Sequence, residues 1–560
     1  MRILMKTVVE FLTVSLALSA ICPSALAADG LWETPKKKIV ASSWDLGCAT
    51  IEEVAAQADL FDETGLDGVV VRVPYVTDAG GKRIRLADEN GDLESTHVTE
   101  AAFGRYVPIL RKMTAEHASL KHSFLGCNWS PVNGHRISWT NDAAWAQFAA
   151  NMKVLASVAK RGGLVGICAD AEDYGNIGQF WRKSFEPPFG VTGPLARERG
   201  RQIGRAMFGE FPEMRVLSFW FLSLNKSYAN SDDPVAVMRA EGDLWPMFIN
   251  GLLDVMPPAA RLVDGDEHGY WYRTGLFEYE RENVRMLTRA LALIAPENRG
   301  KYRSQLQVGF GLYLDEYINP KKTDYRTKNG SAVEGFREQL GEALYAADEY
   351  VWLWGEKQRW IKWANLRIPY GWMKIGKETW EERLPGLAQM LREAKDPQLE
   401  AVRLLDARRA AGVTNLVEKS LLGKGSNWQN EKRSHGTFTP LPGKGHDGGT
   451  AVLAENVASG CFLFGSSRKA AEGEAYVAEA YARGDGVGTF TVRWKKDGTW
   501  NWNMPGTDAA FGAPDAKGWR RASIKFRVPH GVNEPVLKIN LAQQEGQKAA
   551  FDRIVLYKVD

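Results

Sequence analysis

The sequence predicts an α/β fold, a (β/α)8 TIM barrel followed by an antiparallel β-sandwich domain. Three observations lead to this prediction. Short β-rich runs alternate eight times with amphipathic helical runs between Lys38 and about Trp363, which is typical of such a barrel. No glycine-rich phosphate turn follows the first run, which weakens the alternative of a doubly wound open sheet. Beyond Gly412 the pattern changes to short alternating strands separated by Gly and Asp turns.

The elements follow one another in the order that a barrel requires. The eight expected strands are residues 39–44, 68–73, 121–128, 164–170, 214–222, 261–266, 307–314 and 350–354. Helical spacing of apolar residues predicts helices at 51–64, 142–160, 196–211, 235–255, 280–293 and 333–347. The later β-rich runs lie at 474–482, 488–494, 523–528, 536–541 and 551–557. We therefore assign residues 28–412 to the barrel with its trailing charged helices and 413–560 to the sandwich.

The first 27 residues have the pattern of a cleaved signal peptide. Arg2 and Lys6 precede an apolar run at 11–21, and Ala25 and Ala27 form a small-x-small cleavage site. The apolar run is too short to span a bilayer, and no later segment has 18 uncharged apolar residues. We expect a secreted or periplasmic protein without a membrane span.

Charge and motifs argue against several other classes of protein. Formal net charge is +3, and no basic run is interleaved with aromatics, which argues against nucleic acid as a partner. The eight His form no HxH or HExxH pattern and the Cys no CxxC pair, so we expect neither a metal nor a cofactor. A Gly-x-Ser-x-Gly elbow is also missing from the sequence.

Carboxylates follow several of the expected strands. Active sites of (β/α)8 barrels lie at the carboxyl ends of the strands, and strand alternation indicates which side chains point inward. This phase places Asp170 and Glu172 together after strand four, Asp315 after strand seven and Glu356 after strand eight. Strand six ends in the run Asp264-Gly265-Asp266-Glu267-His268, where the glycine leaves the phase open. The candidate catalytic residues are Glu172, Glu267, Glu356, Asp170 and Asp315.

Aromatic and polar side chains accompany these carboxylates. The chain contains 20 Trp, whose flat faces stack on sugar rings or fill cores. We expect Trp145 and Trp245, which lie within helical patterns, to be packing residues. The candidate substrate-binding residues are Trp44, Asp45, Arg72, Asn128, Trp129, Tyr174, His268, Tyr313, Trp352 and Trp354.

Convergent carboxylates with aromatic platforms suit glycoside hydrolysis. One carboxyl group protonates the leaving oxygen, and a second acts as nucleophile or activates water. We expect Glu172 to be the general acid and Glu267 or Glu356 its partner. Structural roles stay open for each: Asp170 can support Glu172 by hydrogen bonding, and Glu356 can pair with Lys357 or Arg359.

The run 166–175 (GICADAEDYG) resembles the strand-four ends of glycosidase barrels, in which a D-x-E pair carries an acid Glu. In chitinase-like and other N-acetylhexosamine-specific hydrolases the Asp of that pair helps the substrate's acetamide attack, which implies Glu172 as acid and Asp170 as its assistant. Their longer DxxDxDxE pattern is absent. Cellulase-like barrels place the nucleophile on strand seven, here Asp315-Glu316, and other barrels place the second carboxylate on strand six, here Asp266 or Glu267.

The tail resembles carbohydrate-binding sandwich modules in the runs 476–484 and 550–557. This resemblance implies a sugar platform built from Trp494, Trp500, Trp502 and Trp519. The whole sequence thus predicts a secreted glycoside hydrolase that acts on a poly- or oligosaccharide. Two alternatives are a non-catalytic glycan-binding protein on a degenerate barrel and an N-acetylhexosaminidase that uses substrate assistance.

Overall fold

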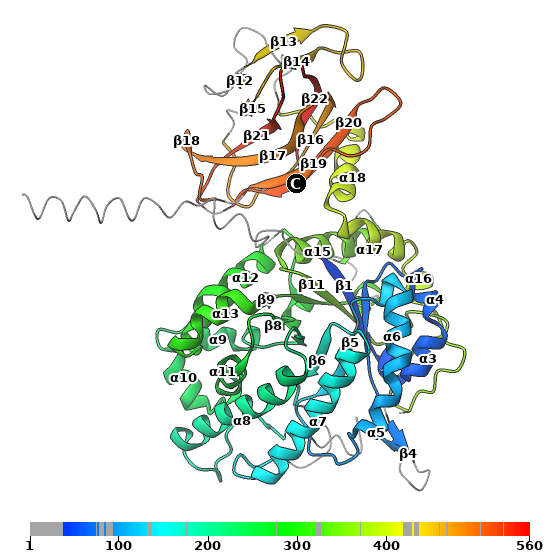
Figure 1. The fold of residues 1–560 in the computed structure, drawn as a ribbon, viewed down its shortest axis with the longest axis vertical. Coiled ribbons are helices and arrows are strands. Elements are labelled where there is room, and N and C mark those ends of the chain that lie inside the picture. The colour runs from blue at the N-terminus through cyan, green and yellow to red at the C-terminus, as the bar shows by residue number, and fades with distance from the viewer. Residues whose placement is uncertain are drawn as a thin grey trace, which may run out of the picture.

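The computed structural model describes residues 37–559 except 74, 78–82, 86–92, 132–135, 174–176, 276, 320–325, 329, 370, 418–427, 431–435, 459, 466–468, 505 and 530. The expected signal peptide, residues 1–27, therefore lies outside the described residues, and so does Tyr174. Figure 1 shows two parts, a large α/β body and a smaller β-rich body joined through helix α18 (Pro397–Ala410).

The large body is a barrel of parallel strands surrounded by helices (Figure 1). Parallel pairing runs around the ring from β11 through β1 to β9. The strands are β1 (Lys38–Ser43), β2 (Gly68–Val71), β5 (Phe124–Asn128), β6 (Gly166–Asp170), β7 (Arg215–Ser218), β8 (Arg261–Asp264), β9 (Leu306–Val308), β10 (Phe310–Tyr313) and β11 (Tyr350–Gly355). All eight predicted barrel strands are present, and the predicted fold class is confirmed.

The seventh strand of the barrel is broken at Gly309. Its first half, β9, pairs with β8, and its second half, β10, pairs with β11. The ring therefore closes through one interrupted strand. At the break, the Gly309 N–H donates to the Asp264 carbonyl at 2.7 Å, so the chain at Gly309 stays hydrogen-bonded to the end of β8.

Alternation along the strands separates two apolar layers. Val40, Val70, Phe124, Cys168 and Trp352 form a cluster inside the barrel. Their neighbours along the chain belong instead to the layer between strands and helices: Ile39, Ala41, Val69, Val71, Leu125, Ile167, Ala169, Val351 and Leu353. The predicted inward phases of strands four and eight are confirmed by this division, and Tyr313 of strand seven packs against the same inner cluster.

Helices cover the outside of the barrel. They are α2 (Trp44–Cys48), α3 (Ile51–Ala56), α4 (Ala58–Phe61), α5 (Glu100–Phe103), α6 (Val107–Glu116), α7 (Asp142–Arg161), α8 (Phe189–Glu210), α9 (Lys226–Ala229), α10 (Pro234–Glu241), α11 (Trp245–Val255), α12 (Glu278–Thr288), α13 (Arg299–Gln305), α15 (Ala332–Ala346), α16 (Trp380–Arg383) and α17 (Leu387–Lys395). The helix predicted at 235–255 is two helices, because Gly242 takes a left-handed conformation (φ 73°) that ends α10. Trp145 and Trp245 are buried, as predicted for packing residues.

The smaller body consists of two antiparallel sheets. One contains β12 (Trp428–Asn430), β15 (Gly460–Gly465), β17 (Val487–Lys496), β18 (Thr499–Trp500), β19 (Thr507–Ala510) and β21 (Glu534–Leu541). The other contains β13 (Thr437–Leu441), β14 (Ala451–Glu455), β16 (Ala475–Gly484), β20 (Arg520–Arg527) and β22 (Lys548–Lys558). Their facing apolar side chains, including Val492, Trp494, Phe526 and Phe551, form one core.

The two bodies touch through α18 and a cluster of charges. Ala401 and Leu405 of α18 pack against Val477 and Tyr557 of the sandwich. Buried Arg527 of β20 donates to Glu342 of α15 at 2.8 Å and pairs with Glu280 of α12 at 3.1 Å. The sandwich is therefore held against the helical layer of the barrel.

Candidate active site

A pocket of about 930 Å³ opens at the carboxyl ends of the barrel strands. Each of the eight strands, or the residues directly after it, contributes to its wall. The lining residues are Ser42, Ser43, Trp44, Gly47, Cys48, Val70, Arg72, Asn128, Asp170, Glu172, Phe219, Trp220, Leu224, Glu267, His268, Tyr270, Trp271, Tyr313, Trp354, Glu356, Pro369, Trp372 and Met373. Its volume lies near the upper end of the usual range for small-molecule sites.

Four of the five predicted catalytic residues line this pocket: Glu172, Glu267, Glu356 and Asp170. The strand phase brings Asp170 and Glu172 from β6 to the same wall. Here the Glu172 backbone N–H donates to the Asp170 Oδ1 at 3.0 Å, so the Asp170 carboxylate holds the chain at Glu172 in a local turn. Asp170 also lies 3.7 Å from the Arg72 guanidinium, whose Nη1 donates to Asn128 at 3.1 Å.

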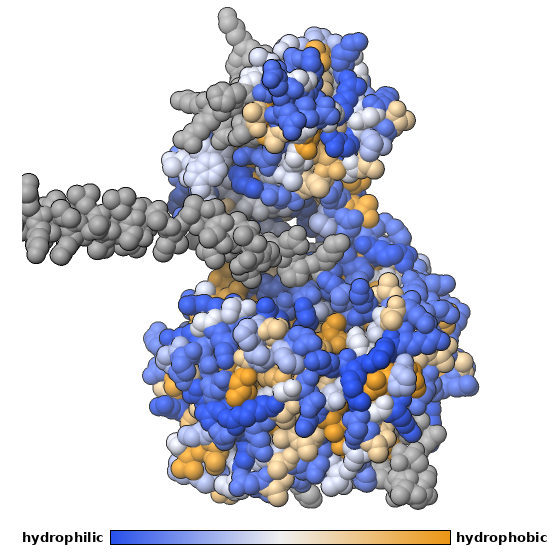
Figure 2. Space-filling model, in the orientation of Figure 1, coloured by the Kyte–Doolittle hydropathy of each residue, from blue (hydrophilic) through white to orange (hydrophobic). Residues whose placement is uncertain are grey.

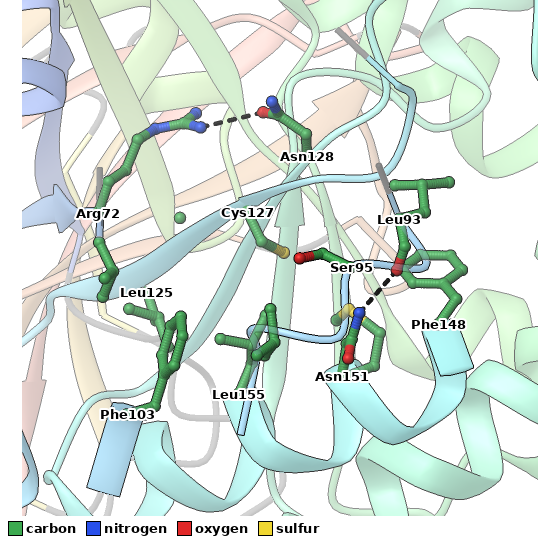
Figure 3. A pocket seen from close by; sticks show the side chains of 14 residues that line it. Arg72, Leu93, Ser95, Phe103, Leu125, Cys127, Asn128, Phe148, Asn151 and Leu155 are labelled. Atoms are coloured by element: carbon green, nitrogen blue, oxygen red, sulfur yellow. Dashed lines mark hydrogen bonds between the residues drawn. The ribbon is translucent and has the colours of Figure 1, made fainter. Parts of the chain in front are cut away.

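A glycine makes room for this arginine. A Cβ atom at Gly126 would lie 2.8 Å from the Arg72 Cγ atom and 3.1 Å from its Nε atom. Because Gly126 has no side chain, the Arg72 stem can cross β5 and reach Asp170 and Asn128. Arg72 and Asn128 also border a smaller cavity of about 90 Å³ beneath them (Figure 3). Apolar side chains such as Phe103 and Phe148 line most of that cavity, while Cys127 and Ser95 point toward each other across it.

The carboxyl group of Glu267 has a strongly shifted pKa. Burial is the main cause, and the negative charges of Glu172 and Asp170 add to it, so that the pKa of Glu267 rises to about 8. The Tyr270 hydroxyl, which is hydrogen-bonded to Glu267, acts in the opposite direction. Glu267 therefore keeps its proton at neutral pH while close to two other carboxyl groups.

Glu356 and Asp315 have different surroundings. Trp354 Nε1 donates to Glu356 at 3.2 Å, and the Tyr313 hydroxyl is hydrogen-bonded to the same carboxylate. Asp315 does not line the pocket, because its carboxylate accepts the backbone N–H groups of Glu356 and Lys357 at 2.7 and 2.9 Å. Burial raises the pKa of Asp315 to about 6. Its role in this structure is to hold the chain that carries Glu356.

Three residues expected to bind substrate do not line the pocket. Trp129 is fully buried and packs edge-on against Trp245 and Phe248 in the helical layer. Trp352 stacks on Phe219 inside the barrel and donates to the Gly265 carbonyl at 2.7 Å. Buried Asp45 accepts hydrogen bonds from Ser43, the Trp360 N–H and the Trp363 indole. Core packing and hydrogen bonding account for all three, so they are corrected to structural residues.

Six other residues that were expected to bind substrate line the pocket, and further aromatic residues join them. Trp44, Arg72, Asn128, His268, Tyr313 and Trp354 line the pocket. Strand-end reasoning missed Trp220, Tyr270, Trp271 and Trp372, which come from the turns after strands five, six and eight. Trp271 and Trp372 are 52% and 62% exposed although they line the pocket. Tyr270 and Trp271 follow the acidic run that ends at Glu267, whereas Trp220 and Trp372 have no carboxylate within five residues in the sequence.

A group of possible metal ligands lies outside the pocket. Asp59, Asp62 and His117 place one donor atom each within 4.8 Å of one another near the end of α4. The His117 Nδ1 lies 2.8 Å from Asp62, and Asp62 also accepts from the Ser119 hydroxyl. These bonds explain the cluster as an exposed hydrogen-bonded group.

Among the described residues, no helix has the length and apolar character needed to cross a membrane.

No family model and no curated protein matches the chain. Among solved structures it is similar to the enzymatically active domain of bacteriophage CBA120 tailspike protein 4, with 13% identity over 24% of this chain and 19% of that one, at a TM-score of 0.20. It is similar to the CBM22-1-GH10 modules of Clostridium thermocellum endo-1,4-β-D-xylanase 10B complexed with xylohexaose. The identity is 16% over 23% of this chain and 26% of that one, and the TM-score is 0.19. It is also similar to a family 16 carbohydrate-binding module, with 13% identity over 25% of this chain and 99% of that one, at a TM-score of 0.20. The chain thus spans only about a fifth to a quarter of the first two structures, and likenesses this slight leave its activity to be argued from the site.

Proposed function

We propose that this protein is a secreted glycoside hydrolase in which Glu172 and Glu267 act as a pair on an oligo- or polysaccharide. The observation that carries the proposal is the coupling of these two groups. Glu267 holds a proton up to about pH 8, partly because the charge of Glu172 is near it, and both line a pocket rich in aromatic side chains. A protonated carboxyl beside an ionised one is the arrangement that glycosidic bond cleavage needs.

The electrostatics favour a particular division of roles. Glu267 carries the proton at neutral pH and is suited to protonate the leaving oxygen as general acid. Glu172, whose negative charge raises the pKa of Glu267, is suited to act as nucleophile or base. This reverses the assignment expected from the D-x-E pair alone. Asp170 supports Glu172 through the hydrogen bond to its N–H, and Arg72 and Asn128 complete the wall around them.

The test compares four carboxamide variants on a panel of glycans. Glu172→Gln and Glu267→Gln each remove an ionisable group with little change in shape, and we expect kcat/KM to fall by about a thousandfold or more. Glu116→Gln, an exposed residue on α6, is the matched control and should retain full turnover. We propose that Glu356, which accepts the Trp354 indole N–H, binds substrate and takes no part in proton transfer, so Glu356→Gln should have a smaller effect.

Three outcomes would contradict the proposal. Full turnover by Glu172→Gln or Glu267→Gln would show that the pair is not catalytic. Tight glycan binding without cleavage by the wild type would favour a glycan-binding protein. Cleavage confined to N-acetylated sugars, with an acetamide-blocked analogue left intact, would favour substrate assistance over a protein nucleophile.

A further inference from the structure

We propose that Asp266 and His268 form a second functional unit of the active site, in which Asp266 positions His268 and His268 binds a hydroxyl group of the sugar beside the scissile bond. The proposal rests on the proposed glycosidase function. The residues lie at the end of β8, on either side of Glu267. They link a buried carboxylate to an imidazole in the pocket wall.

The backbone at Asp266 departs from a regular strand. Its φ is 26° and its ψ is 76°, a positive-φ conformation that Asp and Asn tolerate better than most residues. The Asp266 carbonyl accepts the N–H groups of Gly269 and Gly311 at 2.9 and 3.2 Å, which holds this bend. Because of the bend, Glu267 and His268 both line the pocket, whereas regular alternation would have sent them to opposite faces.

The Asp266 side chain is completely buried below the pocket. Its Oδ2 accepts the Tyr272 hydroxyl at 2.7 Å, and the Lys226 ammonium lies 3.7 Å from its Oδ1. The His268 Nδ1 approaches the same Oδ1 at 3.3 Å. An ionised carboxylate can only accept hydrogen bonds, so Nδ1 of His268 must carry a proton. The other ring nitrogen, Nε2, is then left for a ligand in the pocket.

Asp266 belongs to a network of charged groups around Lys226. Lys226 also lies 3.6 Å from Glu282 and is hydrogen-bonded to Tyr272. Glu282 in turn pairs with buried Arg285. Asp264, two residues before Asp266, accepts hydrogen bonds from the Ser223 hydroxyl, the Ser223 N–H and the Asp266 N–H through its carboxylate.

The side chain that these contacts hold contributes little to the core. The His268 side chain is 43% exposed, so its ring packs little against the core. Core packing therefore does not explain the bent backbone and the buried charge of Asp266. Strained backbone of this kind tends to occur where a functional group needs a fixed position. A fixed imidazole next to the proposed acid fits the binding of a sugar hydroxyl.

The experiment uses the full chain with four variants. His268→Ala removes the ring, and His268→Gln keeps a polar group near the position of Nε2. Asp266→Asn removes the charge but keeps a residue that accepts positive φ. Asp243→Asn is the matched control, since Asp243 is also buried and accepts a Tyr hydroxyl, that of Tyr228, but lies outside the pocket.

We expect His268→Ala to lower kcat/KM by about tenfold to a hundredfold, and His268→Gln to recover part of the loss. A deoxy-sugar substrate that lacks the matching hydroxyl should lower kcat/KM of the wild type by a similar factor. The same substrate should leave kcat/KM of His268→Ala almost unchanged. In the free wild-type protein, ¹⁵N NMR should show Nδ1 of His268 protonated, and Asp266→Asn should move the proton toward Nε2. Asp243→Asn should lower Tm only.

Several results would overturn the proposal. These are unchanged kcat/KM in His268→Ala, a neutral His268 with its proton on Nε2 in the wild type, or an Asp266→Asn variant that differs from wild type only in Tm. If the wild type cleaves no glycan, the proposed function fails on its own. In that case the NMR measurement still tests the pair, and equal glycan affinity of wild type and His268→Ala would overturn the binding role.

Discussion

Individual residues in this protein owe their chemistry to burial more than to identity. Glu172, Glu267 and Glu356 are the same amino acid on one rim. Burial and two nearby carboxylates lift the pKa of Glu267 to about 8, and Glu356 accepts the Trp354 indole N–H. Trp129 and Trp44 likewise follow strand ends, but one is sealed in the helical layer and the other lines the pocket.

The raised pKa of Glu267 predicts a pH-dependent stability. The folded group binds a proton up to about pH 8, while the unfolded group releases it near 4.5. Its contribution is therefore fully present below about pH 4.5 and is lost as the pH rises toward 8. Glu267→Gln cannot ionise, so its Tm relative to the wild type should increase by a few degrees between pH 5 and pH 8. Thermal melts across this range test it, and a constant difference in Tm would contradict it.

At the scale of elements, the turns after the strands provide the exposed aromatics. Trp271 lies in the 3₁₀ turn η5 (Glu267–Trp271), with Tyr270 and Tyr313 rings 6.4 and 6.5 Å away. Trp372 meets Trp44 edge-on at 5.5 Å, and the Lys357 ammonium lies 4.8 Å from the Trp44 ring. Neighbouring rings thus support both indoles while more than half of each stays accessible.

These two indoles predict a dependence on substrate length. Trp271→Ala and Trp372→Ala should each lower kcat/KM by about tenfold on long oligosaccharides, through KM, because stacking area is lost. Turnover of a short aryl glycoside should change little. Trp181→Ala, an exposed residue outside the pocket lining, is the control. Equal losses on short and long substrates would contradict this prediction.

The hairpin of β17 and β18 gives the sandwich a different aromatic surface. Of the four Trp expected to form a platform, Trp494 and Trp519 are buried, whereas Trp500 and Trp502 stack at 4.7 Å and Trp502 is 65% exposed. We predict that Trp502→Ala weakens binding of an insoluble polysaccharide about tenfold without changing kcat on soluble substrate. Pull-down assays measure the binding, with Lys496→Ala on the same hairpin as control. Unchanged binding by Trp502→Ala would remove this surface from glycan recognition.

At the scale of the whole molecule, buried charge joins the barrel to the sandwich. Arg527 contacts Glu342 and Glu280, and its guanidinium lies 4.5 Å from the Phe277 ring. The face of the molecule in Figure 2 is mainly hydrophilic with scattered apolar residues.

Loss of that arginine should uncouple the two bodies. Arg527→Ala leaves Glu342 without its cationic partner in a buried place, which costs about 3–5 kcal/mol when such a pair is broken. We expect calorimetry to show two unfolding transitions in place of one, with unchanged kcat/KM on soluble glycans. Arg520→Ala, which lies on β20 and donates to the Gly484 carbonyl within the sandwich, is the control. A single unshifted transition in Arg527→Ala would contradict this role.

The sequence by itself determined the barrel, the order of its strands and the inward direction of Asp170, Glu172, Tyr313 and Trp354, because strand alternation and hydrophobic spacing are local properties of the chain. Only the tertiary structure decided that Trp129, Trp352 and Asp45 are structural, that Trp271 and Trp372 reach the pocket, and that the chain bends at Asp266. Burial, the approach of charges from different strands and positive-φ bends depend on neighbours distant in sequence. Local pattern therefore identified which strand ends carry the candidate groups, and packing decided which of them meet and in which protonation state.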